Sequence, residues 1–308
     1  MMKIELLDLG YALVKQLSNG TTQPLTVFYE LNDDSSLNLD KLVLYPRITC
    51  DVSTELSSDM GNLLALSGYV TNTGTASGAC WSDTTLHAIN EVIERDDESQ
   101  FLLDMNMGRK SWKIFLPEEG TDERQLFDEL TVGKGKNGVL FYSRLKHLSW
   151  CARHQREPNG EAELGFGCSS SLKTAIQRAT TELQQIHYPI SIGSAWADNG
   201  ADFPDNLEKY PNMAKLASRF FDISPRTEAS IISIEDSIEI SSVKQLRDRG
   251  YSPMARCIWR DDIAAGSVVV SHVVVLGLET LNNLIFNQPI LLLGRLRNEE
   301  NIRFLLEE

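Results

Sequence analysis

The chain has 308 residues, and its 43 Asp and Glu residues outnumber its 29 Lys and Arg residues, giving a formal net charge of −14. This acid excess, with no run of Lys or Arg, argues against a protein that docks on nucleic acid or an anionic membrane through a basic face. The hydrophobic share of 42% is ordinary for a globular chain, which argues against disorder, collagen or coiled coil for the chain as a whole.

The cysteines and the apolar segments indicate the compartment. The five cysteines are widely spaced, odd in number and form no CxxC pair, which favours free thiols in a reducing cytosol over a disulfide framework or zinc knuckle. The N-terminal stretch carries charges among its apolar residues and does not resemble a signal peptide. The most apolar segment, 268–275, is far shorter than the roughly 20 residues that span a bilayer. We therefore expect a cytoplasmic protein with no membrane partner.

Strand-like and helical patterns alternate along the chain. Strands are predicted at 41–45, 61–72, 139–144, 231–240, 254–259 and 268–276, and helices at 82–107, 122–130, 172–187 and 213–221. Ser82 and Asp83 are expected to cap the first helix, and 133–138 are expected to form a turn. Loops are expected at 74–80 and up to Gly167. The interleaving favours a mixed α/β or α+β layer fold.

Two segments, 74–94 and 165–185, repeat one pattern. In each, a glycine precedes a glutamate by 17 residues on a predicted helix, and a second oxygen-bearing side chain follows three residues later. The first copy has Gly74, Glu91 and Glu94, and the second has Gly165, Glu182 and Gln185. One interpretation is a pseudo-repeat that builds one site from two loop–helix units. The other is that any two amphipathic helices after a glycine turn look alike.

The acids of these helices have the spacing of a cation site. Residues i and i+3 share a helix face, so Glu91 and Glu94 would project side by side and repel each other. Carboxylate oxygens suit hard cations such as Mg²⁺, and Glu182 and Gln185 could complete the ligand set. Magnesium held by few carboxylates usually bridges to substrate phosphates, which indicates a nucleotide.

Other interpretations of the same acids stay open. A solvated acidic face, or an ion pair with Arg95, would explain either motif alone. A di-iron or di-manganese carboxylate protein is a further possibility, although these helices carry no ExxH and the predicted strands argue against a four-helix bundle.

The first of these helices also resembles a known family. Residues 74–97, GTASGACWSDTTLHAINEVIERDD, resemble the first signature of the YcaO family, in which a Gly/Ala-rich loop leads into a helix ending in E-x-x-E-R-D. Glu182-x-x-Gln185 is similar to a later signature, and the run VVVLGLE at 273–279, followed by Gly294-Arg295, is similar to a third. The resemblance extends over roughly residues 45–300.

The resemblance implies an ATP- and Mg²⁺-dependent enzyme that activates a peptide backbone amide. In cyclodehydratases, a Cys, Ser or Thr side chain attacks the preceding carbonyl, the resulting oxygen is phosphorylated, and phosphate leaves to give an azoline. Other members use external sulfur to make a thioamide, or an amine to make an amidine. The implied fold is a single α+β YcaO-like domain over 1–308. Within it, 1–45 form an extension packed on a core at 46–300, and the repeated loop–helix units form one nucleotide site.

The resemblance also assigns roles to individual residues. The expected Mg²⁺ ligands, which would thereby hold the ATP phosphates for catalysis, are Glu91, Glu94 and Glu182. The expected nucleotide contacts are Ser77, Arg95, Gln185 and Arg295, and the small residues at 74–78 would let the backbone approach the ligand.

Several positions depart from the family pattern. Ala88 stands where many members carry Ser, Arg178 where some carry a further Glu, and Leu276 where Pro is usual. No proline follows Pro289, whereas many azoline-forming members end in a proline-rich tail. We therefore expect an enzyme of ribosomally made, modified peptides that needs a separate leader-peptide-binding partner and a precursor peptide. The alternatives are a catalytically weak scaffold subunit and a thioamide-forming enzyme.

Overall fold

A computed structural model describes most of the chain. The described residues are 25–46, 73–109, 113–132, 139–144, 150–156, 163–187, 207, 209–217, 230–232, 243–263, 266–279, 281, 284, 290, 292 and 294–307. The chain divides into two compact units. Unit 1 comprises Met1–Asp96 and Ser241–Arg303, and unit 2 comprises Asp97–Ile240 and Phe304–Glu308. Within the described ranges, no helix is both long and apolar enough to cross a membrane.

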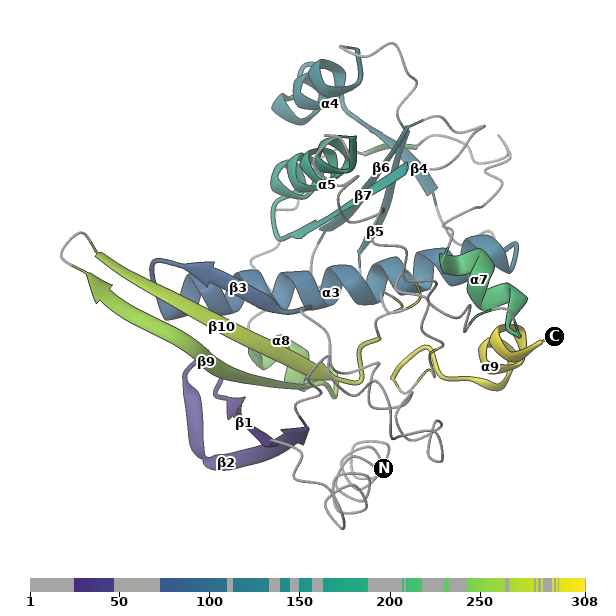
Figure 1. Cartoon of the computed structure of the whole chain (residues 1–308). Coiled ribbons are helices and arrows are strands. Elements are labelled where there is room, and N and C mark those ends of the chain that lie inside the picture. Colours follow the sequence, from purple (N-terminus) through teal and green to yellow (C-terminus); the bar gives the residue numbers. More distant parts are fainter. Residues whose placement is uncertain are drawn as a thin grey trace, which may run out of the picture. The chain divides into compact units, whose positions relative to one another are not determined.

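Unit 1 is built on one antiparallel sheet (Figure 1). Its strands are β1 (Leu25–Leu31), β2 (Leu37–Pro46), β3 (Thr75–Gly78), β9 (Ser252–Ile263) and β10 (Gly266–Leu276), in the order β2-β1-β9-β10-β3. The described helices are α8 (Val243–Asp248), α9 (Glu299–Leu306) as far as Arg303, and α3 (Trp81–Asn106) as far as Asp96. The β-branched run of β10 pairs on both edges, with β9 and with β3, as expected of an interior strand.

The two faces of this sheet pack differently. Gly78 of β3 lies opposite Val269 of β10 and faces α3 so closely that a Cβ at Gly78 would come within 2.6 Å of Thr84 Oγ1. Since strand side chains alternate, even-numbered residues of β3 and odd-numbered residues of β10 share the face toward α3. The opposite face carries the cluster of Phe28, Met254 and Val274, with Leu276 packed against it.

The β1–β2 hairpin is fastened to the rest of unit 1 by side chains. The indole Nε1 of Trp81, the first residue of α3, donates to the Ser35 carbonyl in the hairpin turn at 2.8 Å. The Arg247 guanidinium of α8 lies 3.0 Å from Glu30 and 3.1 Å from Asp33. The hairpin is therefore tied to the start of α3 as well as to the sheet.

Unit 2 has a second five-stranded sheet (Figure 1). Its strands are β4 (Lys113–Pro117), β5 (Val139–Arg144), β6 (Trp150–Arg156), β7 (Glu163–Ser169) and β8 (Ser230–Ile232), in the order β7-β6-β5-β4-β8. All pairs are antiparallel except β4 with β8. The described helices are the rest of α3, α4 (Asp122–Val132), α5 (Leu172–His187) and α7 (Pro211–Ala217).

Strand β7 is packed on both sides. A Cβ at Gly167 would lie 2.2 Å from the Ala175 carbonyl oxygen and 2.5 Å from the Ala179 nitrogen, so Gly167 faces the backbone of α5. Phe166 points to the other side and meets Phe101 of α3 edge to face, with ring centroids 6.4 Å apart. Phe127 of α4 joins α5 in one buried cluster, which places both helices on the same face of the sheet.

The α+β fold class is confirmed, and many of the predicted elements are found. The predicted helices at 82–107, 122–130 and 172–187 correspond to α3, α4 and α5, and the predicted strands at 41–45, 139–144, 254–259 and 268–276 to β2, β5, β9 and β10. The predictions at 213–221 and 231–240 are met by α7 and β8 over the described residues only. The strand at 61–72 and the turn at 133–138 lie outside the described residues, and the single-domain arrangement stays a prediction.

Two predicted loops are wrong. Residues 75–78 form the edge strand β3, and Gly165 and Gly167 lie inside the edge strand β7. Glycine serves there not for a turn but for the close approach of a helix to the strand. In both units an edge strand therefore runs into a closely packed helix, so the repeated pattern corresponds to two strand–helix units rather than two loop–helix units.

The absence of a side chain at Gly167 should be essential to unit 2. In Gly167→Ala the added methyl would meet helix backbone that cannot move as a flexible side chain can, so we expect a loss of about 3 kcal/mol or more in the free energy of unfolding. Urea unfolding would measure this. Gly120→Ala is the control, because Gly120 has open space around it but a φ of +85°, which should cost only about 1–2 kcal/mol. Equal losses in the two variants would contradict the packing argument.

The pH dependence of stability should include a contribution from His272. Burial, and secondly the nearby Arg256 cation, lower the pKa of His272 to about 4, opposed by a hydrogen bond with the Thr73 backbone. The imidazole of the unfolded chain has a pKa near 6.5, so between pH 6.5 and 4 it binds a proton in the unfolded state but not in the folded state. The stability that the neutral His272 side chain gives the folded state is therefore complete above pH 6.5 and is lost as the pH falls toward 4. Unfolding at pH 7.5 and 4.5 should show His272→Gln losing less stability on acidification than wild type, by up to about 3 kcal/mol. Identical losses would contradict the shift.

Candidate functional site

The predicted site residues fall into both units of the chain. Glu91, Glu94, Arg95, Ser77 and Arg295 belong to unit 1. Glu182 and Gln185 belong to unit 2. The predicted residues therefore form two groups, one on α3 and one on α5, which are called the first and second half-sites after the prediction, and each is described by itself.

The first half-site depends on where α3 begins. The helix starts at Trp81, and the Cys80 carbonyl accepts from the Thr84 backbone N–H at 3.1 Å and from the Thr84 hydroxyl at 2.6 Å. Cys80 is thus the residue before the first turn, and the predicted capping by Ser82 and Asp83 is wrong. The Thr84 hydroxyl also lies against Gly78, so the strand before the helix and the first turn of the helix are fixed together.

Glu91 and Glu94 lie one turn apart on α3, as predicted. Glu91 is half-buried, whereas Glu94 is only 9% exposed. The Arg95 guanidinium lies 3.7 Å from Glu94 Oε1, which is long for a salt bridge. Burying a carboxylate raises the cost of ionising it, and this cost falls when a cation is bound. The two carboxylates therefore fit a hard cation, to which proteins typically supply one or two carboxylates beside substrate phosphates.

The next acid of the same helix is buried completely. Asp96 has no exposed surface; its Oδ1 accepts from the Glu279 backbone N–H at 2.8 Å and its Oδ2 from Arg295 Nε at 2.5 Å. Glu279 is also buried, and its Oε1 accepts from the Gly294 backbone N–H. Arg295 in turn donates its backbone N–H to the Gly277 carbonyl at 2.9 Å. These groups join α3 to the turn after β10 and to the segment at 294–296.

This network fixes the side chain of Arg295 against Asp96. It also includes Asp96 and Glu279, two buried acids that were not predicted to belong to the site. Arg295 was predicted to contact a phosphate, and the partner that the structure gives its Nε is Asp96. Asp96 lies in the ERDD motif, in which Glu94 and Arg95 are the predicted site residues, and Glu279 ends the VVVLGLE motif. An acid in a run such as ERDD is usually taken for solvated, and only the distant glycine–arginine pair at 294–295 could have indicated its burial.

The second half-site is anchored to the edge of β7. Glu182 Oε2 accepts from the Phe166 backbone N–H at 2.6 Å, and Arg178 Nη1 donates to the Cys168 carbonyl at 3.0 Å. These two side chains lie four residues apart on α5 and satisfy the outward N–H and C=O groups of an edge strand. Glu182 thus has a structural contact that the sequence did not predict, and Arg178 stabilises the strand edge at a position where an acid would be a further ligand.

Two predicted nucleotide contacts, Ser77 and Gln185, remain to be located. Ser77 is exposed and lies opposite Val270, on the face of the sheet away from α3, so the structure does not bring it to Glu91 and Glu94. Gln185 lies on α5 one turn after Glu182, and its side chain is not among those described. The described side chains include no group of three or more His, Cys, Asp or Glu that could hold a metal ion.

Comparison with known proteins gives a family. A family model described as YcaO cyclodehydratase, ATP- and Mg²⁺-binding, matches residues 36–279, well over half of the chain. No curated protein matches the chain.

Several solved structures align with the chain. The Escherichia coli microcin synthetase McbBCD complex with pro-MccB17 bound has a chain that aligns with a TM-score of 0.54 and 11% identity over 89% of this chain and 70% of its own. A heterocyclase in complex with substrate and cofactor aligns with a TM-score of 0.52 and 16% identity over 83% of this chain. YcaO from Methanopyrus kandleri, bound with AMPPCP and Mg²⁺, aligns with a TM-score of 0.49 and 17% identity over 87% of this chain and 68% of its own. The chain spans only 33% of that heterocyclase and 39% of the heterocyclase TruD.

Removing the charge of Asp96 should destabilise unit 1 strongly. Asp96→Asn keeps an acceptor for the Glu279 N–H but removes the charge that faces the Arg295 guanidinium, which is itself largely buried. We expect a loss of about 3 kcal/mol or more in the free energy of unfolding, measured in urea. Asp128→Asn is the matched control, since Asp128 is half exposed in an ion pair with Arg124, and it should lose less than about 1 kcal/mol. Similar losses would show that the buried pair has no special weight.

Proposed function

Because the chain belongs to the YcaO family, we propose that it is an ATP- and Mg²⁺-dependent enzyme that activates a peptide backbone amide. The expected outcome is an azoline in a ribosomally made, modified peptide. The family match is the observation that carries the proposal. The buried and half-buried carboxylates on α3 support it, since Mg²⁺ in proteins is usually bound through one or two carboxylates together with substrate phosphates.

The roles proposed for individual residues come from the resemblance to the family. Mg²⁺–ATP, when bound, supplies the phosphoryl group that turns an amide oxygen into a leaving group. Glu91 and Glu94 would hold the cation from α3, and Glu182, with Gln185, from α5. Arg95 lies beside Glu94 and would balance negative charge there. Asp96 and Arg295 would hold α3 in place, which makes them positioning residues unless Arg295 also reaches a phosphate.

Partners are part of the proposal. One matching structure is a synthetase complex with its pro-peptide bound, and another is a heterocyclase with substrate. We propose by analogy that this chain acts on a precursor peptide and depends on a separate protein that binds the leader of that peptide. Thioamide formation with external sulfur stays an alternative, which mass spectrometry of the product would distinguish. An azoline loses one water per ring, whereas a thioamide exchanges oxygen for sulfur.

A second candidate is a catalytically weak subunit that serves as a scaffold. The observation in its favour is Arg178, which donates to the Cys168 carbonyl where some family members would offer another carboxylate. A scaffold would bind the precursor peptide or the partner protein without hydrolysing ATP. ATP turnover by the chain mixed with peptide and partner would exclude it.

Nucleotide binding tests the proposed ligands directly. Isothermal titration calorimetry with ATP and Mg²⁺ should show binding weakened about 10-fold or more in Glu91→Gln, Glu94→Gln and Glu182→Gln, because each variant loses one anionic ligand. Gln at position 182 can still accept from the Phe166 N–H, so its effect would report lost charge rather than a lost strand contact. Glu118→Gln, at an exposed position before α4, is the control and should bind as wild type does. Normal binding by all three variants would remove these residues from the site, and no binding by wild type with its partner present would exclude the enzyme.

A further inference from the structure

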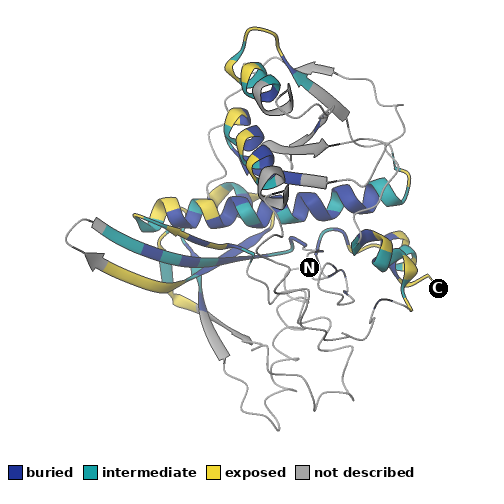
Figure 2. Cartoon of the chain, turned by 45° about the horizontal axis from the view of Figure 1, so that its top comes forward, coloured by how far each residue is buried: buried dark blue, intermediate teal, exposed yellow. Residues whose placement is uncertain are grey.

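The outer part of β9 is exposed along its length. Pairing of β9 with β1 is limited to Met254 and Ala255, although β9 continues to Ile263. All five residues from Cys257 to Asp261 are exposed, whereas those from Tyr251 to Ala255 are buried (Figure 2). Ile258 and Trp259 are 45% and 50% exposed, which is unusual for adjacent large apolar side chains.

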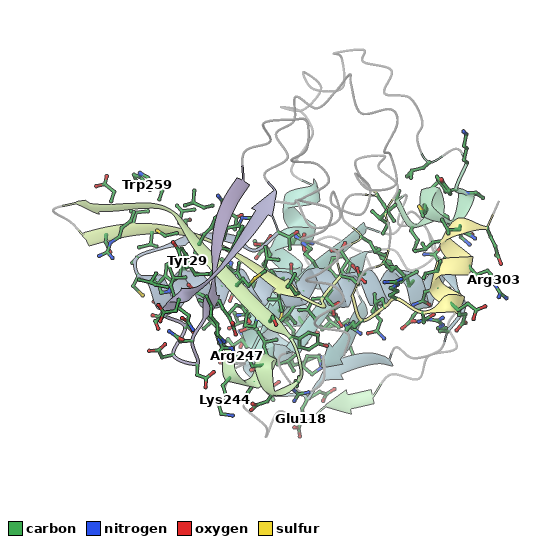
Figure 3. All side chains as sticks on the ribbon, turned by 90° about the horizontal axis from the view of Figure 1, so that it is seen from below. Tyr29, Glu118, Lys244, Arg247, Trp259 and Arg303 are labelled. Carbon is green, nitrogen blue, oxygen red and sulfur yellow. The ribbon has the colours of Figure 1, made fainter. Side chains whose placement is uncertain are left out.

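A β-bulge directs these two side chains to the same face. Cys257 lies opposite Ser271 and Trp259 opposite Val270, so Ile258 is the extra residue in β9. Ser271 faces α3 and Val270 faces away from it. Ile258, which follows Cys257, and Trp259, which lies beside Val270, therefore both face away from α3. Figure 3 shows Trp259 near the outer end of the β9–β10 hairpin.

The surface that results is defined here as the arm face. It consists of Ile258, Trp259, Val268 and Val270, with Arg256 at one end and Asp261 at the other. Arg256 lies opposite His272, and Asp261 lies opposite Val268, so both charges are on this face. Thr75 and Ser77 of β3 adjoin it on the far side of β10, and the side chains of both are exposed.

The charges on the arm face have the symmetry of a twofold interface. Along β9 the order is a cation at 256, the apolar pair at 258 and 259, and an anion at 261, which is symmetric about the midpoint of the pair. Two copies with antiparallel β9 strands would place Arg256 of each against Asp261 of the other, and Ile258 against Trp259. We propose that the arm face is a self-complementary interface at which a second copy of this chain binds.

Charge and symmetry favour a second copy of the chain as the partner of the arm face. A chain with a formal charge of −14 repels its own copies, so association needs local pairs of opposite sign as well as apolar contact. Twofold packing provides two such pairs and closes on itself, which prevents further growth. Buried Trp residues commonly contribute most of the binding energy at the centre of an interface. The proposal does not depend on nucleotide binding.

Analytical ultracentrifugation of the full chain between about 1 and 100 µM tests the proposal. Wild type should be dimeric at the upper concentrations, and Trp259→Asp should raise the dissociation constant about 30-fold or more. Asp261→Arg places like charges in contact and should raise it about 10-fold. Arg260→Glu is the matched control, because Arg260 is exposed beside Asp261 but opposite Val269, on the other face of the sheet.

Pair rescue separates a designed contact from a general loss of folding. Asp261→Arg combined with Arg256→Asp in one chain should restore dimerisation, and circular dichroism must show each variant folded. If Arg256→Asp unfolds the chain because it loses the contact with the Phe28 ring at 5.3 Å, Asp261→Arg and Trp259→Asp still decide the question. A monomeric wild type at 100 µM would overturn the proposal. A dimer insensitive to both substitutions would also overturn it, as would a monomer that binds a precursor peptide or another protein through Trp259.

Discussion

Asp96 is a fully buried carboxylate, and its two oxygens hold two segments that lie far along the chain, the turn at Glu279 and the side chain of Arg295. A buried anion is tolerated only when hydrogen bonds and a cation replace the water it has lost. Both replacements come from outside α3, so the helix cannot shift without breaking them. The positions of Glu91 and Glu94, five and two residues earlier on the same helix, depend on the same contacts. Breaking the ion pair between Asp96 and Arg295 should therefore also displace Glu91 and Glu94.

A second constraint, close approach of helix to strand, recurs in both units. Gly78 brings β3 to the first turn of α3, and Gly167 brings β7 to the middle of α5. Each strand lies at the edge of its sheet, and each helix carries proposed ligands. Packing against the helix thus explains the glycines in these strands without any ligand. The similarity of the two segments is a similarity of strand–helix units, whatever they bind.

The predictions from sequence were most accurate where a long hydrophobic period was uninterrupted. Helix α5 begins at Leu172 and ends at His187 as predicted, because its apolar spacing and the following proline mark both ends. The edge strands β3 and β7 were missed, since their glycines have the composition of a turn and the helices that require them are recognisable only in three dimensions. The contacts of Arg295 and Glu182 were missed for a related reason. Each depends on a partner in another element, and no local pattern records it.

The hydrogen bond from the Phe166 amide to Glu182 should be visible in hydrogen exchange. That amide lies on the outward edge of β7, the edge strand of its sheet among the described residues. We expect the carboxylate of Glu182 to slow the exchange of this amide with deuterium from the solvent. A cation that drew the carboxylate away would release the amide and speed its exchange, whereas a cation bound by the other oxygen would leave it slow. A single backbone hydrogen would thus report whether a cation binds at Glu182.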